Sequence, residues 1–500
     1  MEAIGYNCPM GAGATTIGPF VLDRSRMALL QGGKVVAIGQ RGFALLATLA
    51  DRDDVVGKAE LMDAAWPGVT VEEGNLTVQI AALRKALGTR PDGSDWIITV
   101  PRVGYRLVRG NAAAPPTGHG LPLLTVLPFE GISPDAETAA FAEGLVEDLF
   151  AALSRFRSFQ LLARRTTNPF GPDYLVEGSV RRSGEQVRIV ARLIVVATGA
   201  TAWSHIFDGS LKNGFGLQDT VASVAAAHIS RAIRQVEWNR SARERPDSSH
   251  AYDLVQRGIA MLEAISEPRN REAIVLLEQA VELEPEDATT LAMAAWAYEQ
   301  RVHAGWTTMV EDEERCLELT RAAIAVGGDD ANVLGHCGVA LQLCGGEWEH
   351  GLQMTLRGVE INPNSTTALF FAGVAHLTGG TLAGARDHFE RARQYATDDE
   401  VGNPTAGLAH VLICEGRYEE ALLLAERAVA MRPRFFWAHW TAIVANAQLG
   451  RTEAAHKALA IYRAADPDAT HSRIEAGQRS RDPGRHANLL EGLRIAGMPG

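Results

Sequence analysis

The richest candidate for a binding surface lies on a helix predicted over residues 73–87. Its apolar stripe consists of residues that recur at helical spacing: Leu76, Ile80, Leu83 and Leu87. The opposite face combines short side chains with polar and cationic ones: Asn75, Thr77, Val78, Ala81, Ala82, Arg84 and Lys85. Short side chains allow close approach, either to another protein or to the floor of a DNA major groove, where Val and Ala can contact a thymine methyl group. The helix alone leaves both alternatives open.

No other set of residues has the spacing of a catalytic or metal-binding site. Glu143, Glu147 and Asp148 share one predicted helix without a partner base, so we interpret them as a solvated face. Arg181 and Arg182 could bind an anion, although a charge pair at a hairpin tip is the commoner meaning. The 14 histidines form no HExxH motif and no Cys/His cluster of metal-ligand spacing. We therefore predict no enzyme, no cofactor and no metal.

Cysteine usage and hydropathy indicate a cytoplasmic protein. The five cysteines are odd in number and scattered along the chain: Cys8, Cys316, Cys337, Cys344 and Cys414. We interpret them as reduced thiols, and the seven-residue spacing of Cys337 and Cys344 as packing rather than a redox or metal site. There is no run of about 18 apolar residues and no signal peptide, so no membrane partner is predicted. Residues 1–17 are expected to form a disordered tail.

Charge is unevenly distributed along the 500 residues, a length that suggests about three domains. The chain has 48 Lys/Arg and 60 Asp/Glu, with a formal net charge of −12. The first 245 residues are close to neutral, and nearly all the excess acid lies beyond them. The N-terminal part is therefore compatible with nucleic-acid contact of modest affinity, whereas the C-terminal half is expected to face something else.

The elements around the helix of residues 73–87 suggest how it is positioned. Residues 39–54 and 58–68 each predict an amphipathic helix, the second closed by Pro67-Gly68. Downstream, residues 96–100 and 104–108 read as two short β segments, and residues 20–39 upstream have hairpin character. A small sheet, three helices and a terminal hairpin make a winged helix, whose third helix enters the major groove.

The stretch from about Phe20 to Arg109 resembles the winged-helix domain of the OmpR/PhoB class of bacterial regulators. The resemblance is carried by "ELMDAAWPG", "VEEGNLTVQIAALRKALG" and "IITVPRVGYRLV". It is closest to one-component regulators of the CadC, ToxR and HilA kind, which lack a receiver domain. The resemblance implies a DNA-binding domain over residues 18–110 with double-stranded DNA as its partner.

The resemblance also implies positions for the contacts. Phosphate contacts would fall on Trp66, Arg84, Lys85 and the backbone near Asn75, and wing contacts near Arg102 and Arg106. Thr77, Val78, Ala81 and Ala82 would face the groove.

Two of these positions depart from the family pattern, and two aromatic side chains are expected in the core. Ala81 and Ala82 stand where several family members carry arginines, and "PRVGY" replaces the usual wing order of glycine and then a basic residue. We therefore expect methyl contacts and DNA shape to contribute more than arginine-to-guanine contacts. Trp66 is expected to lie at least half in the core, and Tyr105 more in the core than against DNA.

A Pro-containing linker at residues 111–120 precedes a second predicted domain at 121–240. Its pattern indicates strands at 121–130 and 159–165, a helix at 137–157, three antiparallel strands within 173–211 and a helix at 216–236. One sheet face covered by two helices gives a small α+β sandwich. The stretches "VLPFE", "YLVEGSVRRSGEQVRIVARLI" and "TGATAWSHIFDGSL" resemble a TolB-N-like domain. Its role is not indicated.

Beyond a polar linker at 241–250, a period near 34 residues emerges. Its clearest unit has Gly416, Tyr418, Ala421, Ala428 and Pro433, with small residues where paired helices touch. This pattern resembles tetratricopeptide repeats and predicts about six of them over 251–470, stacked into a superhelix, with a cap or tail at 471–500.

The groove of such a superhelix is expected to bind a protein, a peptide or a small ligand, or to support a homo-oligomer. Because the C-terminal half has an excess of acidic residues, the groove is expected to be acidic on average and to favour a basic or mixed partner. Four aromatic residues could line the groove, although packing between repeats is favoured for most of them: Phe435, Phe436, Trp437 and Trp440.

The predicted fold class is multidomain, α+β and then all-α: a winged helix, a small α+β sandwich and a tetratricopeptide superhelix. The predicted function is that of a soluble one-component transcriptional regulator. The alternative is a protein-interaction scaffold with a degenerate winged helix, which the Ala81-Ala82 pair keeps open.

Overall fold

The computed structural model describes residues 14–500, except for gaps at residues 18, 25, 32–33, 53–54, 70, 90–94, 101–102, 108–119, 133–134 and 163–170. The predicted linker at 111–120 lies almost entirely outside the described residues. The chain forms two compact units. One comprises Met1–Leu127, Gln160–Glu177 and Arg192–Ala202, and the other comprises Pro128–Phe159, Gly178–Ala191 and Trp203–Gly500.

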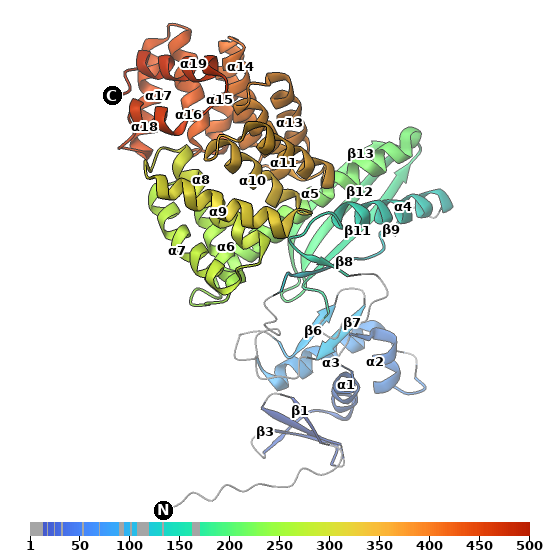
Figure 1. Ribbon diagram of the computed structural model, residues 1–500. Helices are drawn as coiled ribbons and strands as arrows, with labels where there is room; N and C mark the ends of the chain where they lie inside the picture. The colour runs from blue at the N-terminus through green and yellow to red at the C-terminus, as the bar shows by residue number, and fades with distance from the viewer. Residues whose placement is uncertain are drawn as a thin grey trace, which may run out of the picture. The chain divides into compact units, whose positions relative to one another are not determined.

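The N-terminal part of the first unit has the predicted order of a sheet, three helices and a hairpin (Figure 1). Its first sheet is antiparallel: β1 (Ala14–Ile17), β2 (Phe20–Asp23), β3 (Ala28–Gln31) and β4 (Lys34–Val36). The helices are α1 (Gln40–Ala50), α2 (Lys58–Ala65) and α3 (Glu73–Leu87). The second sheet has the order β5-β7-β6, with β5 (Val56–Gly57), β6 (Ile97–Val100) and β7 (Gly104–Leu107).

One core holds these elements together, and α3 contributes its predicted leucine seam to it. Leu76, Ile80, Leu83 and Leu87 are all buried among side chains of α1, α2 and both sheets. Phe20 on β2 meets Trp96 beside β6 edge to face, with ring centroids 5.8 Å apart. The N-terminal sheet is therefore part of the winged-helix core.

The expected disordered tail over residues 1–17 is wrong for its last four residues. Ala14–Ile17 forms β1, which pairs with β2, and Ile17 is fully buried. The pairing partner Phe20–Asp23 offers an otherwise open strand edge, and burying Ile17 adds to the same core. Residues 1–13 lie outside the described part.

The middle region contains a mixed sheet and two helices. The strand order is β10-β8-β11-β12-β13, and β9 pairs with β11. The strands are β8 (Leu123–Val126), β9 (Glu130–Gly131), β10 (Gln160–Leu161), β11 (Tyr174–Ser183), β12 (Gln186–Val195) and β13 (Ala200–Ser210). The helices are α4 (Ala136–Leu153) and α5 (Gly214–Arg243), which follows the 3-10 turn η1 (Leu211–Asn213). They pack on one another, and Gln218 Nε2 donates to Phe141 O.

Helix α5 extends beyond its predicted end into the expected polar linker at 241–250. Ser241 and Ser248 both donate to the carboxylate of the fully buried Asp253, and Arg245 pairs with it at 3.1 Å. Because Asp253 lies on the first repeat helix, these polar residues attach α5 to the repeats. The segment is a joint rather than a linker.

The repeats form six antiparallel helix pairs, as the period predicts. The pairs are α6 (Ala251–Leu262) with α7 (Glu267–Leu283), α8 (Ala288–His303) with α9 (Val310–Gly327), α10 (Ala331–Leu343) with α11 (Trp348–Ile361), α12 (Thr366–Thr378) with α13 (Leu382–Tyr395), α14 (Gly402–Cys414) with α15 (Tyr418–Met431), and α16 (Phe436–Gln448) with α17 (Thr452–Ala465). Two further helices follow, α18 (His471–Gly477) and α19 (Pro483–Ile495), and the latter packs on α16.

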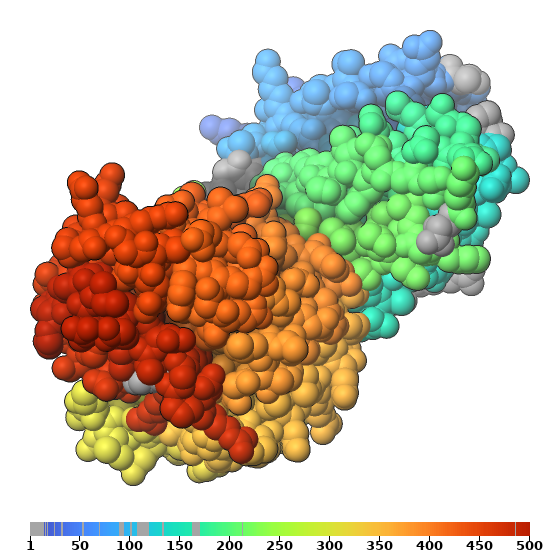
Figure 2. Space-filling view, turned by 90° about the horizontal axis from the view of Figure 1, so that it is seen from above, coloured from blue at the N-terminus to red at the C-terminus, as the bar shows by residue number. Residues whose placement is uncertain are grey.

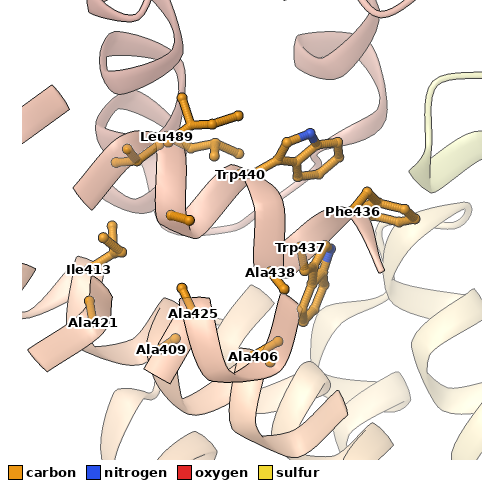
Figure 3. Packing of buried hydrophobic residues seen from close by; sticks show 14 of the residues in the cluster. Ala406, Ala409, Ile413, Ala421, Ala425, Phe436, Trp437, Ala438, Trp440 and Leu489 are labelled. Atoms are coloured by element: carbon orange, nitrogen blue, oxygen red, sulfur yellow. The ribbon is translucent and has the colours of Figure 1, made fainter. Parts of the chain in front are cut away.

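The two helices of a pair differ in burial. Helix α10 is buried along nearly its whole length, whereas α13 buries a single stripe that includes Ala385, Phe389 and Ala392. A helix that is apolar all round must be covered on all sides, so the first helices lie inside the array and the second helices outside. Figure 3 shows small residues such as Ala406, Ala409 and Ala425 where neighbouring helices meet.

Glycines set the turns and the closest helix contacts of the repeats. Gly346, Gly380 and Gly416 have positive φ values of 67°, 84° and 72° between paired helices, a backbone region that L side chains rarely adopt. Gly338 on α10 and Gly351 on α11 face each other so closely that a Cβ on Gly338 would lie 2.5 Å from Gly351 O.

We expect Gly351→Ala to destabilise the repeats by about 1–3 kcal/mol, because neither backbone can give way without disturbing the pair. Thermal unfolding of the full chain, followed by far-UV circular dichroism, measures the effect. Gly214→Ala is the matched control, since a Cβ there meets nothing within 4 Å. Equal melting temperatures for the two variants would contradict the close approach.

Candidate functional sites

The exposed face of α3 lies opposite its buried seam and carries the predicted contact residues. Val78 is 64 % exposed, although it is apolar. The other predicted groove-facing residues, Thr77, Ala81 and Ala82, are also exposed, as is Asn75 at the predicted backbone contact. The middle of this face is therefore a shallow surface of methyl groups with polar groups toward its N-terminal end.

Arg84 does not have the free guanidinium that the sequence suggested. It donates to Ile97 O at 2.9 and 2.7 Å and to Thr99 Oγ1 at 2.7 Å, and its Nε lies 3.1 Å from Asp95 Oδ2. These contacts join the C-terminal turn of α3 to β6. These bonds give Arg84 a structural role between the helix and the wing, and its phosphate contact stays a prediction.

The remaining predicted cations have different surroundings. Lys85 is exposed and has no ion pair within the part of the chain that the structure describes. Arg106 on β7 is half-buried and already has a partner within the chain. Arg102 lies outside the described residues. Lys85 is thus the cation on α3 that is most available to a phosphate.

Trp66 and Tyr105 are core residues, only 6 % exposed each. The expectation for Tyr105 is confirmed, and a direct phosphate contact of the Trp66 ring is not favoured by this burial. The guanidinium of Arg41 lies over the Trp66 ring, 5.5 Å from its centroid. Sequence reasoning missed Arg41, because a single basic residue in the first turn of α1 gives little signal by itself.

The N-terminal end of α3 is acidic, which stabilises the helix but repels phosphate. Glu73 accepts a hydrogen bond from Lys58 Nζ at 2.7 Å, and this bond raises the pKa of Lys58 above its ordinary value. The pair partly neutralises this end of the helix. Glu72, the N-cap residue, is exposed.

The wing sequence "PRVGY" has a structural explanation in Gly104. A Cβ at this position would collide with Val56 O, because β7 pairs closely with β5 there. Glycine is therefore required one residue before the buried Tyr105.

The interior of the repeats contains a second candidate site, a pocket of about 90 Å³ that we call the inner pocket. It is lined by Leu262, Glu263, Ile265, Trp296, Glu299, Gln300, His303, Phe370, Phe371, Val374, Asn403, Arg432, Phe435, Phe436 and Trp437. Three of the four aromatic residues assigned to packing between repeats thus also line the pocket. Most of its wall is aromatic or aliphatic, and its charged residues are Glu263, Glu299 and Arg432.

An ion-pair network around the buried guanidinium of Arg231 lies on one side of the repeats, and we call it the Arg231 network. Arg231 on α5 binds Asp399 Oδ2 at 2.7 Å and lies 3.5 Å from Glu400 Oε1 and 3.8 Å from Glu263 Oε1. Arg432 binds Glu263 Oε2 at 3.2 Å. Burial opposes the ionisation of Asp399, but Arg231 holds the pKa of this carboxyl below its ordinary value.

The C-terminal segment of the chain lies along the other side. Gln478 Nε2 donates to His303 O at 3.0 Å, Arg479 Nη1 to Leu343 O at 3.1 Å, and the Arg481 amide to Thr378 O at 2.9 Å. These acceptors are at or next to the C-terminal ends of α8, α10 and α12. Figure 2 shows the C-terminal residues (red) beside the early repeats (yellow). The chain itself therefore occupies part of the repeat surface that a peptide could use.

Metal and membrane sites find no support within the described residues. No group of three or more His, Cys, Asp or Glu side chains there could hold a metal ion. No described helix has both the length and the apolar character needed to cross a bilayer. Cys316, Cys337 and Cys344 are free, buried thiols.

Comparison with known proteins identifies two parts of the chain. Residues 33–107 match the family described as "Transcriptional regulatory protein, C terminal". Residues 355–399 and 412–477 match two tetratricopeptide repeat families.

Two curated proteins are similar over longer stretches. "Putative adenylate cyclase 3" of Rhizobium meliloti (strain 1021) is 28% identical over 248 residues, which cover 46% of this chain and 42% of that protein. "Transcriptional regulator HilA" of Salmonella typhimurium (strain LT2) is 24% identical over 323 residues, which cover 59% of this chain and 55% of that protein. The chain thus spans about half the length of these relatives.

Among solved structures, that of PilW, a widely conserved type IV pilus biogenesis factor, is 14% identical with a TM-score of 0.33, covering 45% of this chain and 96% of PilW. The matched families agree with the three-helix core and the paired helices described above. The chain therefore carries a transcriptional regulatory domain of the OmpR/PhoB type toward its N-terminus and tetratricopeptide repeats in its C-terminal half.

Proposed function

We propose that the chain is a one-component transcriptional regulator that binds promoter DNA through α3 and receives a signal through its repeats. The observation that carries the proposal is the exposed, short-chained face of α3 opposite a fully buried seam. Val78 and the neighbouring exposed Ala81 and Ala82 form a patch of short side chains, which permits close approach to base edges. The transcriptional regulatory family matched over residues 33–107 supports the same assignment.

Within this proposal the residues have distinct roles. Val78, Ala81 and Ala82 approach base edges, Lys85 contacts a phosphate, and Asn75 and Thr77 supply polar contacts near the N-terminal end of α3. Arg102 and Arg106 remain candidate wing contacts. With few free cations on α3, binding by one copy is weak, so a homo-oligomer on adjacent sites is part of the proposal.

The repeats supply the regulatory part of the proposal. Their interior offers a pocket of small-molecule size, while their outer helices offer surface to a protein partner. We place the protein in the cytoplasm, where DNA is accessible and the free thiols stay reduced.

We expect Val78→Glu to weaken binding of the full chain to its own promoter fragment by on the order of 100-fold, because the new carboxylate would face phosphates and base edges. Fluorescence anisotropy of labelled DNA measures the affinity. Val35→Glu is the matched control: Val35 is 71 % exposed on β4, away from α3, and the charge change is the same. Equal losses in both variants would indicate a general charge effect instead of a contact by α3.

We expect Lys85→Ala to reduce the magnitude of the slope of log affinity against log salt concentration by about 0.9, which is the contribution of one phosphate contact. The loss should be similar on all DNA sequences, because a phosphate contact does not read bases. If the folded wild-type chain fails to bind promoter DNA, the scaffold alternative is supported.

Arg84→Ala is expected to act on stability. Loss of the bonds to Ile97 O, Thr99 and Asp95 should cost about 1–2 kcal/mol and speed hydrogen–deuterium exchange in residues 73–100 of the full chain. Arg26→Ala is the control, because its side chain is 76 % exposed and lies 3.7 Å from Asp23. Unchanged exchange in the Arg84 variant would show that these bonds are dispensable.

A further inference from the structure

The inner pocket contains a carboxyl group without a counterpart. Glu299 on α8 lines the pocket and is only 6 % exposed. Its carboxyl has no hydrogen bond or ion pair with any residue that the structure describes. Buried carboxylates ordinarily have such partners, since an isolated charge in an apolar site is costly.

Neighbouring groups do not neutralise Glu299. Glu263, following α6, and Arg432, following α15, line the same pocket but bind each other at 3.2 Å. His303, one turn along α8, is uncharged: burial and then Arg485 lower its pKa to about 3. From α10, the Cys344 thiol is near enough for Glu299 to raise its pKa, as a smaller contribution. The pocket residues of α12 and α16 are apolar or aromatic, and α14 adds Asn403.

The same pocket offers a second acceptor and several aromatic faces. The Asn403 side-chain oxygen is buried without a hydrogen-bond partner in the described structure. The rings in the wall are those of Trp296, Phe370, Phe371, Phe435, Phe436 and Trp437. Unfilled oxygen acceptors call for a ligand with N–H donors, and aromatic faces attract cations.

We propose that the inner pocket binds a small alkylammonium ion, with Glu299 as its counter-ion, Asn403 as an additional acceptor and the aromatic wall around the alkyl part. The pocket, at about 90 Å³, is several times the volume needed for one water and is small for anything beyond a short-chain amine. This inference specifies the signal within the proposed regulatory function and rests on that function only for its biological meaning.

Protonation of Glu299 should be linked to binding. Burial raises its pKa to about 8 from an ordinary value of 4.5, so the carboxyl of the empty pocket is mostly neutral at pH 7. A cation binds the ionised form, so affinity should weaken about tenfold for each pH unit below this pKa.

Without a ligand, the stability of the protein should also depend on pH through Glu299. The folded-state pKa of Glu299 lies above the unfolded value, so stability is fully present below about pH 4.5 and is lost as pH rises through about 8. The melting temperature of the wild type should therefore fall relative to that of Glu299→Gln across this window, since glutamine has no charge to bury.

The test uses thermal unfolding and calorimetric titration of the full chain with n-butylammonium chloride at pH 8. We expect a saturable rise in melting temperature of about 2–4 °C with n-butylammonium, and none with 1-butanol or sodium butyrate, which lack the cation. Glu299→Gln should abolish the rise. Glu282→Gln, a change at an exposed position on α7, should preserve it.

Several results would overturn the inference. These are no saturable effect of n-butylammonium on the folded wild type, an equal effect on Glu299→Gln, or stabilisation by butyrate instead. The wild-type comparison of the three probes needs no variant and so stands even if Glu299→Gln fails to fold. The titrations contain no DNA, so a negative result for the amine says nothing about promoter binding. Conversely, a failure to bind promoter DNA says nothing about the amine site.

Discussion

The Arg231 network is the interaction on which the shape of the repeat interior depends. Glu263 follows the first repeat helix, Asp399 and Glu400 precede the fifth pair, and Arg231 comes from α5, outside the repeats. Six stacked helix pairs define a curvature but do not by themselves fix how far the two ends approach. Ion pairs that join the first and fifth repeats through one buried guanidinium do fix it. The same bonds place Arg432 and Glu263 in the wall of the inner pocket.

The helices and strands could be predicted largely from the sequence, because their signals are local. The leucine stripe of α3 and the 34-residue period depend on neighbours within one or two turns or one repeat. The long-range ties could not be predicted. Arg231 and Asp399 are far apart in sequence, and any of 48 cations could pair with any of 60 acids. Strand β1 was missed for a related reason, because four residues gain their order only from the edge of β2.

The candidate DNA surface shows the same limit at the level of single residues. A helical wheel correctly separates the buried seam of α3 from its exposed face, but it places Arg84 and Lys85 together as surface cations. Only the three-dimensional fold brings Ile97 O, Thr99 and Asp95 to Arg84. Arg84 therefore holds the helix against the wing, whereas Lys85 remains available for a phosphate contact. The candidate DNA surface is then mainly made of methyl groups, which offer fewer specific contacts to base edges than arginines do.

Glu299 differs from the other buried acidic residues of the repeat unit in a way that bears on function. Asp253 accepts hydrogen bonds from two serines and pairs with Arg245, and Glu237 pairs with Arg240, so both charges are compensated within the fold. Glu299 has no such partner among the described residues, and burial leaves it mostly neutral at pH 7. A cation that enters the inner pocket would stabilise the ionised carboxylate of Glu299. The same pocket wall contains the Glu263–Arg432 pair, which belongs to the Arg231 network. Occupancy of the pocket would therefore change the ionisation of Glu299, whereas the Glu263–Arg432 pair in the same wall already has its charges compensated.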